Sequence, residues 1–102
     1  MAYKTSVAAH TFTVGTTPIE VLPDATAAAT PRQSIYFFNS TSTNKNITLV
    51  FGDAQTVSSG KGYVIAPSGY YLETSESNYE VWQGRVWAIA DSADASLVVV
   101  VR

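Results

Sequence analysis

The chain has 102 residues, of which 46% are hydrophobic and only 14% are charged, and its formal net charge is −2. This length suits one domain, and the scattered Lys and Arg residues form no basic stripe for binding nucleic acid. The absence of cysteine excludes a disulfide framework and a thiolate metal site.

Apolar residues recur at a spacing of two or in short runs, and turn residues interrupt them before a helical stripe can form. This pattern predicts an all-β domain, a single β-sandwich or jelly-roll-like barrel of about eight short antiparallel strands. In chain order, the expected strands cover residues 10–14, 17–22, 32–39, 47–51, 63–66, 70–73, 85–90 and 96–101.

Three local features carry structural signals. Pro18 cannot donate a ladder hydrogen bond, so the second strand should lie at a sheet edge or begin near this proline. The Ala- and Thr-rich stretch between Pro23 and Pro31 is too short for more than about one or two helical turns, so we expect a surface crossover. The polar residues 40–46 are long enough to close a hairpin between their flanking strands.

The two ends of the chain differ in their patterning. Leu97–Val101 is apolar on both faces, so this strand is either central in a sheet or buried by a partner chain. Residues 1–9 lack strand patterning and are either a frayed end or an arm that becomes ordered against a neighbour, which leaves residues 10–102 as the β-sandwich domain. We find neither the apolar core of a signal peptide nor a membrane span, so synthesis and retention in the cytosol are expected.

Candidate catalytic groups are few. A nucleophile needs a base within hydrogen-bond reach and an orienting group behind it, but the single histidine, His10, lies in an alternating strand, so a hydrolase triad is not expected. The carboxylates occur in polar connecting segments, where solvent keeps them ionised and unreactive, and none has the spacing of a calcium loop. We therefore predict no catalytic residue, metal site or cofactor among these carboxylates, namely Glu73, Glu76, Glu80, Asp91 and Asp94.

Aromatic residues are concentrated in the second half of the chain. Tyr70 and Tyr71 are adjacent on one strand, so one of them must face away from the core. Outward aromatic side chains suit a protein interface or a sugar ring equally well, whereas core packing is the simplest role, above all for Trp87. The candidate protein-interface residues are Tyr3, Tyr70, Tyr71, Tyr79 and Trp82.

Several strand and turn signatures follow one another from Val21 onward. They are Val21–Pro23, the strand Pro31–Asn39, Ile47–Gly52 with its Phe-Gly turn, Gly62–Tyr70 with its Ala-Pro-Ser-Gly turn, Gln83–Ala90, and the apolar last strand. In this order they resemble the small β-sandwich proteins of tailed bacteriophage virions. The resemblance covers most of the chain, although its motifs are structural and carry no chemistry.

This resemblance implies a non-enzymatic virion structural protein that decorates and cements a capsid. The implied partners are the major capsid protein or another virion protein, and a dimer or trimer of the chain itself. The implied location is the capsid surface, after synthesis in the host cytoplasm, with no nucleic acid, membrane or cofactor involved. The alternative is a carbohydrate- or host-surface-binding module of a phage fibre or tail component; a small enzyme is disfavoured because the sequence lacks a suitable base or metal site.

Overall fold

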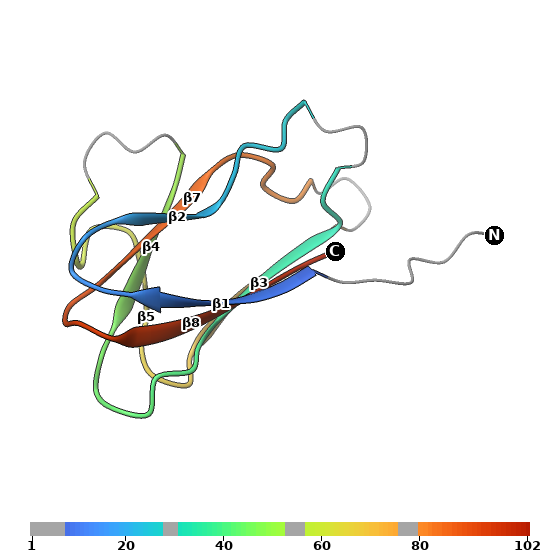
Figure 1. Ribbon diagram of the computed structural model, residues 1–102. Coiled ribbons are helices and arrows are strands. Elements are labelled where there is room, and N and C mark those ends of the chain that lie inside the picture. The colour runs from blue at the N-terminus through green and yellow to red at the C-terminus, as the bar shows by residue number, and fades with distance from the viewer. Residues whose placement is uncertain (1–7, 28–30, 53–56, 76–79) are drawn as a thin grey trace.

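The computed structural model describes residues 8–27, 31–52, 57–75 and 80–102, and these form an all-β domain without a helix (Figure 1). The predicted fold class and number of strands are confirmed, and seven of the sixteen strand ends shift by one or two residues. The strands are β1 (Ala8–Val14), β2 (Ile19–Leu22), β3 (Ser34–Asn39), β4 (Ile47–Phe51), β5 (Tyr63–Ile65), β6 (Tyr70–Thr74), β7 (Val86–Ala90) and β8 (Ala95–Val101).

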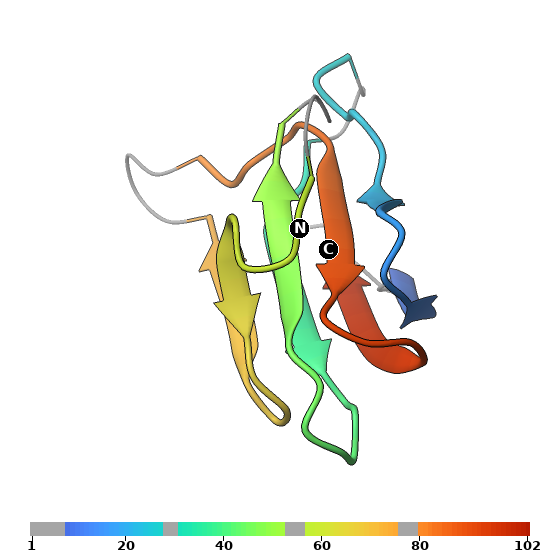
Figure 2. The ribbon, with the colours of Figure 1, turned by 90° about the vertical axis from the view of Figure 1, so that its left-hand side faces the viewer.

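The strands form two four-stranded antiparallel sheets, which Figure 2 shows as two layers. The first sheet has the order β1-β8-β3-β6 and the second has the order β2-β7-β4-β5. Consecutive strands alternate between the sheets, and only β4 and β5 are consecutive neighbours within one sheet. Eight strands in two such sheets make the arrangement a jelly roll.

The expected hairpin between β3 and β4 is wrong, because these strands belong to different sheets and residues 40–46 cross between them. The crossing is held by Asn39, whose buried Nδ2 donates to the carbonyl oxygens of Lys45 and Ile65 at 2.9 and 3.0 Å. Its Oδ1 also accepts the N–H of Thr41 at 3.1 Å. These bonds tie the loop to the second sheet, so loop length alone does not determine strand pairing.

Two other expectations about strand position are confirmed. β2 begins directly after Pro18 and is an edge strand, while β8 lies between β1 and β3 inside its sheet. The segment after Pro23 crosses from the second sheet to the first. Its described residues are not helical, and residues 28–30 of this segment lie outside the described ranges.

The core lies between the inner faces of the two sheets. Inward side chains alternate with outward ones along β3 and β8, as expected for strands buried on one side. Burying each large aliphatic or aromatic side chain contributes about 1.5–3 kcal/mol. The fully buried hydrophobic residues at the centre are Val14, Ile35, Phe37, Ile47, Leu49, Val86, Ala88, Leu97 and Val99.

The N-terminal boundary of the described fold is at Ala8, which pairs with Val101, and β1 therefore starts two residues before the segment expected from alternation. Residues 1–7 lie outside the described ranges. The proposed role of residues 1–9 as an arm stays a prediction.

Candidate interaction surface

The outward side of the first sheet carries no charged side chain. Its members are the residues of β1, β8, β3 and β6 whose side chains point away from the core, and we call them the neutral face. They are Ala9, Thr11, Thr13, Ser96, Val98, Val100, Ser34, Tyr36, Phe38, Tyr70, Leu72 and Thr74.

Strand register arranges the neutral face in transverse rows. One row runs Thr11, Val98, Phe38, Tyr70 and a second runs Ala9, Val100, Tyr36, Leu72. Tyr70 and Leu72 are 59% and 51% exposed. Apolar side chains therefore continue across all four strands without an ion pair or a charge between them.

Aromatic rings lie together on the neutral face. The ring of Tyr36 is 5.9 Å from that of Tyr70 and 6.4 Å from that of Phe38, measured between centroids. Neighbouring strands hold these rings, so their positions are fixed by the sheet. Rigid aromatic side chains lose little conformational entropy when they enter an interface, which suits them to binding.

The outward side of the second sheet is different because the chain covers part of it. The backbone N–H of Gly60 donates to Thr48 Oγ1 at 2.9 Å, and Thr48 is buried although it points outward on β4. Gly62 packs directly against the backbone of β4, because a Cβ added to it would stand 2.4 Å from the carbonyl oxygen of Leu49. This face also carries the exposed ion pair between Glu20 and Arg85, at 3.0 Å.

The predicted interface residues do not form one surface. Tyr70 faces outward on the neutral face, whereas Tyr71 points inward and is partly buried, which confirms that the two tyrosines have opposite orientations. Tyr71 and Trp82 both contact the ring of Phe51, at centroid distances of 5.2 and 6.1 Å, and Trp82 itself is exposed in the segment before β7. Tyr3 and Tyr79 lie outside the described residues.

Two neutral-face aromatics were not chosen from the sequence. Tyr36 and Phe38 alternate with the buried Ile35 and Phe37 along β3, so the strand is apolar on both sides. From the sequence, two apolar faces are predicted only for Leu97–Val101. The sequence signal is thus a second strand with two apolar faces, but only strand pairing shows that both outward faces are on the same side.

Glu73 differs from its predicted environment. It lies within β6, as the expected strand 70–73 requires, but its carboxylate is not solvated as predicted: it accepts hydrogen bonds from the Tyr71 hydroxyl and, at 3.0 Å, from the backbone N–H of Trp82. These contacts link β6 to the segment before β7. Glu80, Asp91 and Asp94 are exposed, as expected, and Glu76 lies outside the described residues.

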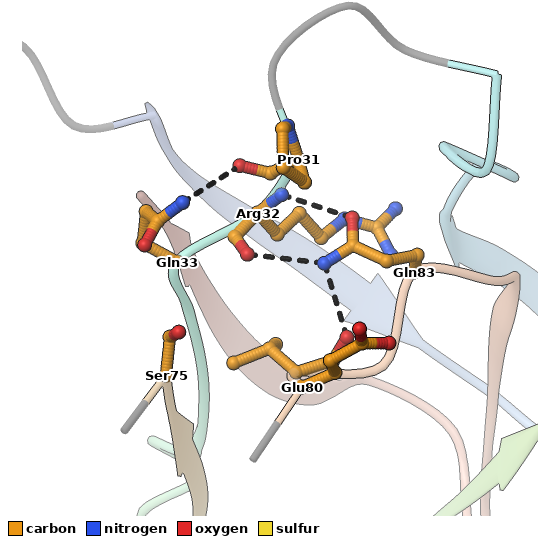
Figure 3. A pocket seen from close by; sticks show the side chains of 7 residues that line it. Pro31, Arg32, Gln33, Ser75, Glu80 and Gln83 are labelled. Carbon is orange, nitrogen blue, oxygen red and sulfur yellow. Dashed lines mark hydrogen bonds between the residues drawn. The ribbon is translucent and has the colours of Figure 1, made fainter. Parts of the chain in front are cut away.

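Arg32 is the centre of a polar cluster at one end of the sandwich. Its side chain is 8% exposed, and its guanidinium donates to the carbonyl oxygens of Pro23, Trp82 and Gly84. The Gln83 side chain binds the Arg32 backbone in both directions, with Oε1 accepting at 2.9 Å and Nε2 donating at 3.0 Å (Figure 3). We call these five residues the Arg32 cluster.

The Arg32 cluster is built for structure. Burial lowers the pKa of the Arg32 guanidinium, and the nearby Asp24 carboxylate opposes this shift. The carbonyl oxygens stabilise the positive charge, and they join the segment after β2 to the segment before β7. The adjoining cavity measures about 190 Å³, below the roughly 300–1,000 Å³ of ordinary ligand sites.

A larger hollow of about 520 Å³ lies between edge strands β1 and β2. His10 and Phe12 border it from β1, and Leu22 and Pro23 border it from the second sheet. His10 is exposed and its ring lies 6.3 Å from that of Phe12. Among the described residues, no serine or threonine forms a hydrogen bond with the His10 side chain.

Within residues 8–27, 31–52, 57–75 and 80–102, no three His, Cys, Asp or Glu side chains gather as ligands for a metal ion. In the same ranges, no helix has the length and hydropathy to cross a membrane. Comparison of the chain with protein-family models, curated proteins and solved structures finds no match.

Proposed function

We propose that this chain is a non-enzymatic structural protein that decorates and stabilises a bacteriophage capsid, and that it attaches through the neutral face. The observation that supports the proposal is that the outward side of the first sheet has no charge in any of its cross-strand rows, and that Tyr70 and Leu72 are exposed there. Such a surface is cheap to desolvate against another protein because no ion must lose its hydration.

The fold supports this proposal by analogy. Jelly rolls occur in viral capsid domains and in lectins, so the architecture fits both capsid attachment and the alternative of sugar binding. The neutral face carries Thr and Ser hydroxyls in other rows, but its row through Tyr36 favours protein contact. Sugar sites combine aromatic rings with polar groups that fix hydroxyls, whereas the Tyr36 and Leu72 row carries only aliphatic neighbours, Ala9 and Val100.

The test is sedimentation of the purified chain with capsids that lack it, and separately with host polysaccharide. We expect co-sedimentation with capsids and none with polysaccharide. Binding to polysaccharide alone would replace capsid decoration with the carbohydrate-binding alternative. Binding to neither would remove both functions.

A pair of matched variants identifies the surface. Leu72→Lys places a charge on the neutral face, and Val64→Lys places the same charge on β5 of the second sheet, where Val64 is 46% exposed. We expect Leu72→Lys to lower capsid affinity by about tenfold or more, since a desolvated unpaired charge is costly. Val64→Lys should bind as the unmodified chain does; equal loss in both variants would show that the neutral face is not the attachment site.

The predicted N-terminal arm gives a separate test. Deleting residues 1–7 leaves β1 intact, because its described pairing begins at Ala8. If an arm contributes to attachment, the shortened chain should keep its unfolding temperature while its capsid occupancy falls. Unchanged occupancy would assign attachment to the sheet surface alone.

A further inference from the structure

The two sheets end in four edge strands, β1 and β6 in the first sheet and β2 and β5 in the second. An edge strand presents backbone N–H and C=O groups that can pair with another chain. Proteins prevent unwanted pairing at such edges with a proline, a bulge, a very short strand or a charged side chain that points inward.

Three of the four edge strands have one of these protective features. β2 follows Pro18 and has a register shift between Glu20 and Leu22. β5 has only three residues. β6 carries Glu73, which lies opposite the buried Ile35 and therefore points to the inner side.

β1 has none of these protective features. It has seven residues, the sequence AAHTFTV, and thus no proline, glycine, acid, lysine or arginine. Its pairing with β8 runs without a shift from Ala8 opposite Val101 to Val14 opposite Ala95. It is the longest edge strand, and in the described part of the chain it pairs with β8 alone.

The free backbone groups of β1 follow from the hydrogen bonds of β8. Ser34 and Arg102 exchange two backbone hydrogen bonds of 3.1 Å. The residues of β8 that lie two, four and six positions before Arg102 therefore also bond to β3. Antiparallel strands alternate bonded and non-bonded positions. The intervening residues of β8 therefore bond to β1, and their partners include His10 and Phe12. The N–H and C=O groups of Ala9, Thr11 and Thr13 consequently point to the free edge.

We propose that a second copy of this chain pairs with β1 along this edge, antiparallel and about a two-fold axis at Thr11. Thr11 then lies opposite Thr11 of the second copy, and Ala9 lies opposite Thr13. Each of these pairs exchanges two backbone hydrogen bonds. An antiparallel pair of identical strands is self-complementary, which is the requirement of a two-fold dimer.

Side-chain chemistry favours a second copy as the occupant of this edge. The edge and the neutral face carry no charge, so two copies approach without like-charge repulsion. Thr–Thr pairs across antiparallel strands are favourable, and His10 comes beside Phe12 of the second copy on the inner side. The two first sheets join into one continuous sheet, with both neutral faces on the same side.

This dimer does not depend on the proposed function, because the purified chain alone tests it. If the neutral face does attach to a capsid, the dimer presents two such faces together and strengthens binding through multivalency. Failure of capsid attachment would leave the dimer intact, and failure of dimerisation would leave a single neutral face available.

Sedimentation equilibrium at loading concentrations from about 1 to 500 µM measures the association, since edge contacts lie at the weak, small end of protein interfaces. We expect a concentration-dependent dimer for the unmodified chain. Thr11→Pro removes an N–H that points to the free edge and spares the β1–β8 hydrogen bonds. It should sediment as a monomer throughout this range.

A charge exchange tests the register without relying on proline. Thr11→Lys and Thr11→Glu each place like charges at the two-fold axis, so each variant alone should dimerise at least tenfold more weakly at low salt. An equimolar mixture should recover the dimer, because Lys at position 11 then faces Glu at position 11. Thr74→Lys, on the far edge of the same face, is the matched control and should dimerise normally.

The results that overturn the proposal are specific. A chain that remains monomeric at every concentration has no such interface. A dimer that persists in Thr11→Lys and Thr11→Glu uses another surface. A mixture no more associated than either variant alone disproves the two-fold position at Thr11, provided circular dichroism shows both variants folded.

Discussion

The Arg32 cluster and the neutral face use polar groups in opposite ways. In the Arg32 cluster, a buried guanidinium and a side-chain amide bind the protein's own backbone. On the neutral face, no charge is present and the polar groups are hydroxyls at the surface. The first region holds segments together, and the second leaves a surface that another protein can cover.

This difference limits what the bacteriophage resemblance can say. Its signature residues include Pro23, Arg32 and Gly84, which meet in the Arg32 cluster, and Asn39, which holds the crossing loop. They are residues that specify the architecture. The signatures also contain the neutral-face residues Tyr36, Phe38 and Tyr70. Because the signatures specify strands and turns and carry no contact chemistry, the resemblance informs the fold more directly than the attachment.

The largest effect should come from breaking the Arg32 cluster. Arg32→Met keeps much of the aliphatic stem but leaves three carbonyl oxygens without their donor. We expect the free energy of unfolding to fall by about 3–5 kcal/mol, measured by urea denaturation.

The matched control is Arg85→Met, since Arg85 is an exposed arginine in a surface ion pair. That variant should lose less than about 1 kcal/mol. Equal losses for the two arginines would show that burial of Arg32 has no special structural effect.

A somewhat smaller effect is expected at the opposite end of the sandwich. Asn39→Ala removes two donated hydrogen bonds and one accepted hydrogen bond at a fully buried position. Thermal and urea unfolding should show a loss of about 2–3 kcal/mol, because buried backbone groups are left unsatisfied. Asn44→Ala, at an exposed position of the same loop, should change stability by no more than about 0.5 kcal/mol.

On the neutral face, stability and attachment should separate. Leu72→Lys alters a side chain that is half exposed, so its free energy of unfolding should change by only about 0.5 kcal/mol. Urea denaturation of the variant used in the capsid assay checks this directly. A loss above about 2 kcal/mol would mean that the face contributes to the fold, and reduced capsid binding could then reflect unfolding.

The smallest effect concerns Asp24, a solvent-exposed neighbour of the Arg32 cluster. Hydrogen bonding from Thr26 lowers the pKa of Asp24 below its ordinary value of 3.8. Its folded pKa is therefore depressed, so its contribution is present at neutral pH and is lost as pH falls through the folded value. Asp24→Asn should have a slightly lower unfolding temperature at pH 7, and the difference should vanish in strong acid; a difference that persists there would have another origin.

Local sequence information was sufficient to predict most strands, because alternation and turn residues act over a few positions. Pro18 marked the start and edge position of β2, and the apolar pattern of Leu97–Val101 indicated a central strand. Strand pairing was harder to predict. The loop after Asn39 permits a hairpin by length, but its direction depends on a bond to Ile65, far along the chain.

The candidate surface was predictable only in part for the same reason. Tyr70 could be singled out as one of two adjacent tyrosines, but Tyr36 and Phe38 join it only because β3 pairs with β6. Arg32 likewise has hydrogen-bond partners some 50 residues away. Such contacts leave no local pattern in a single sequence.

The pairing of Ala8 with Val101 also has a consequence for synthesis of the chain. Chains emerge N-terminus first, so β1 must wait for almost the entire domain before its neighbour β8 is available. Strands that follow one another in the chain lie in different sheets, except β4 and β5. Few native pairings can form early, and folds dominated by such distant contacts acquire their structure slowly, over milliseconds to seconds. During that interval, the uncharged β1 segment stays without its strand partner and is open to premature association with other nascent chains.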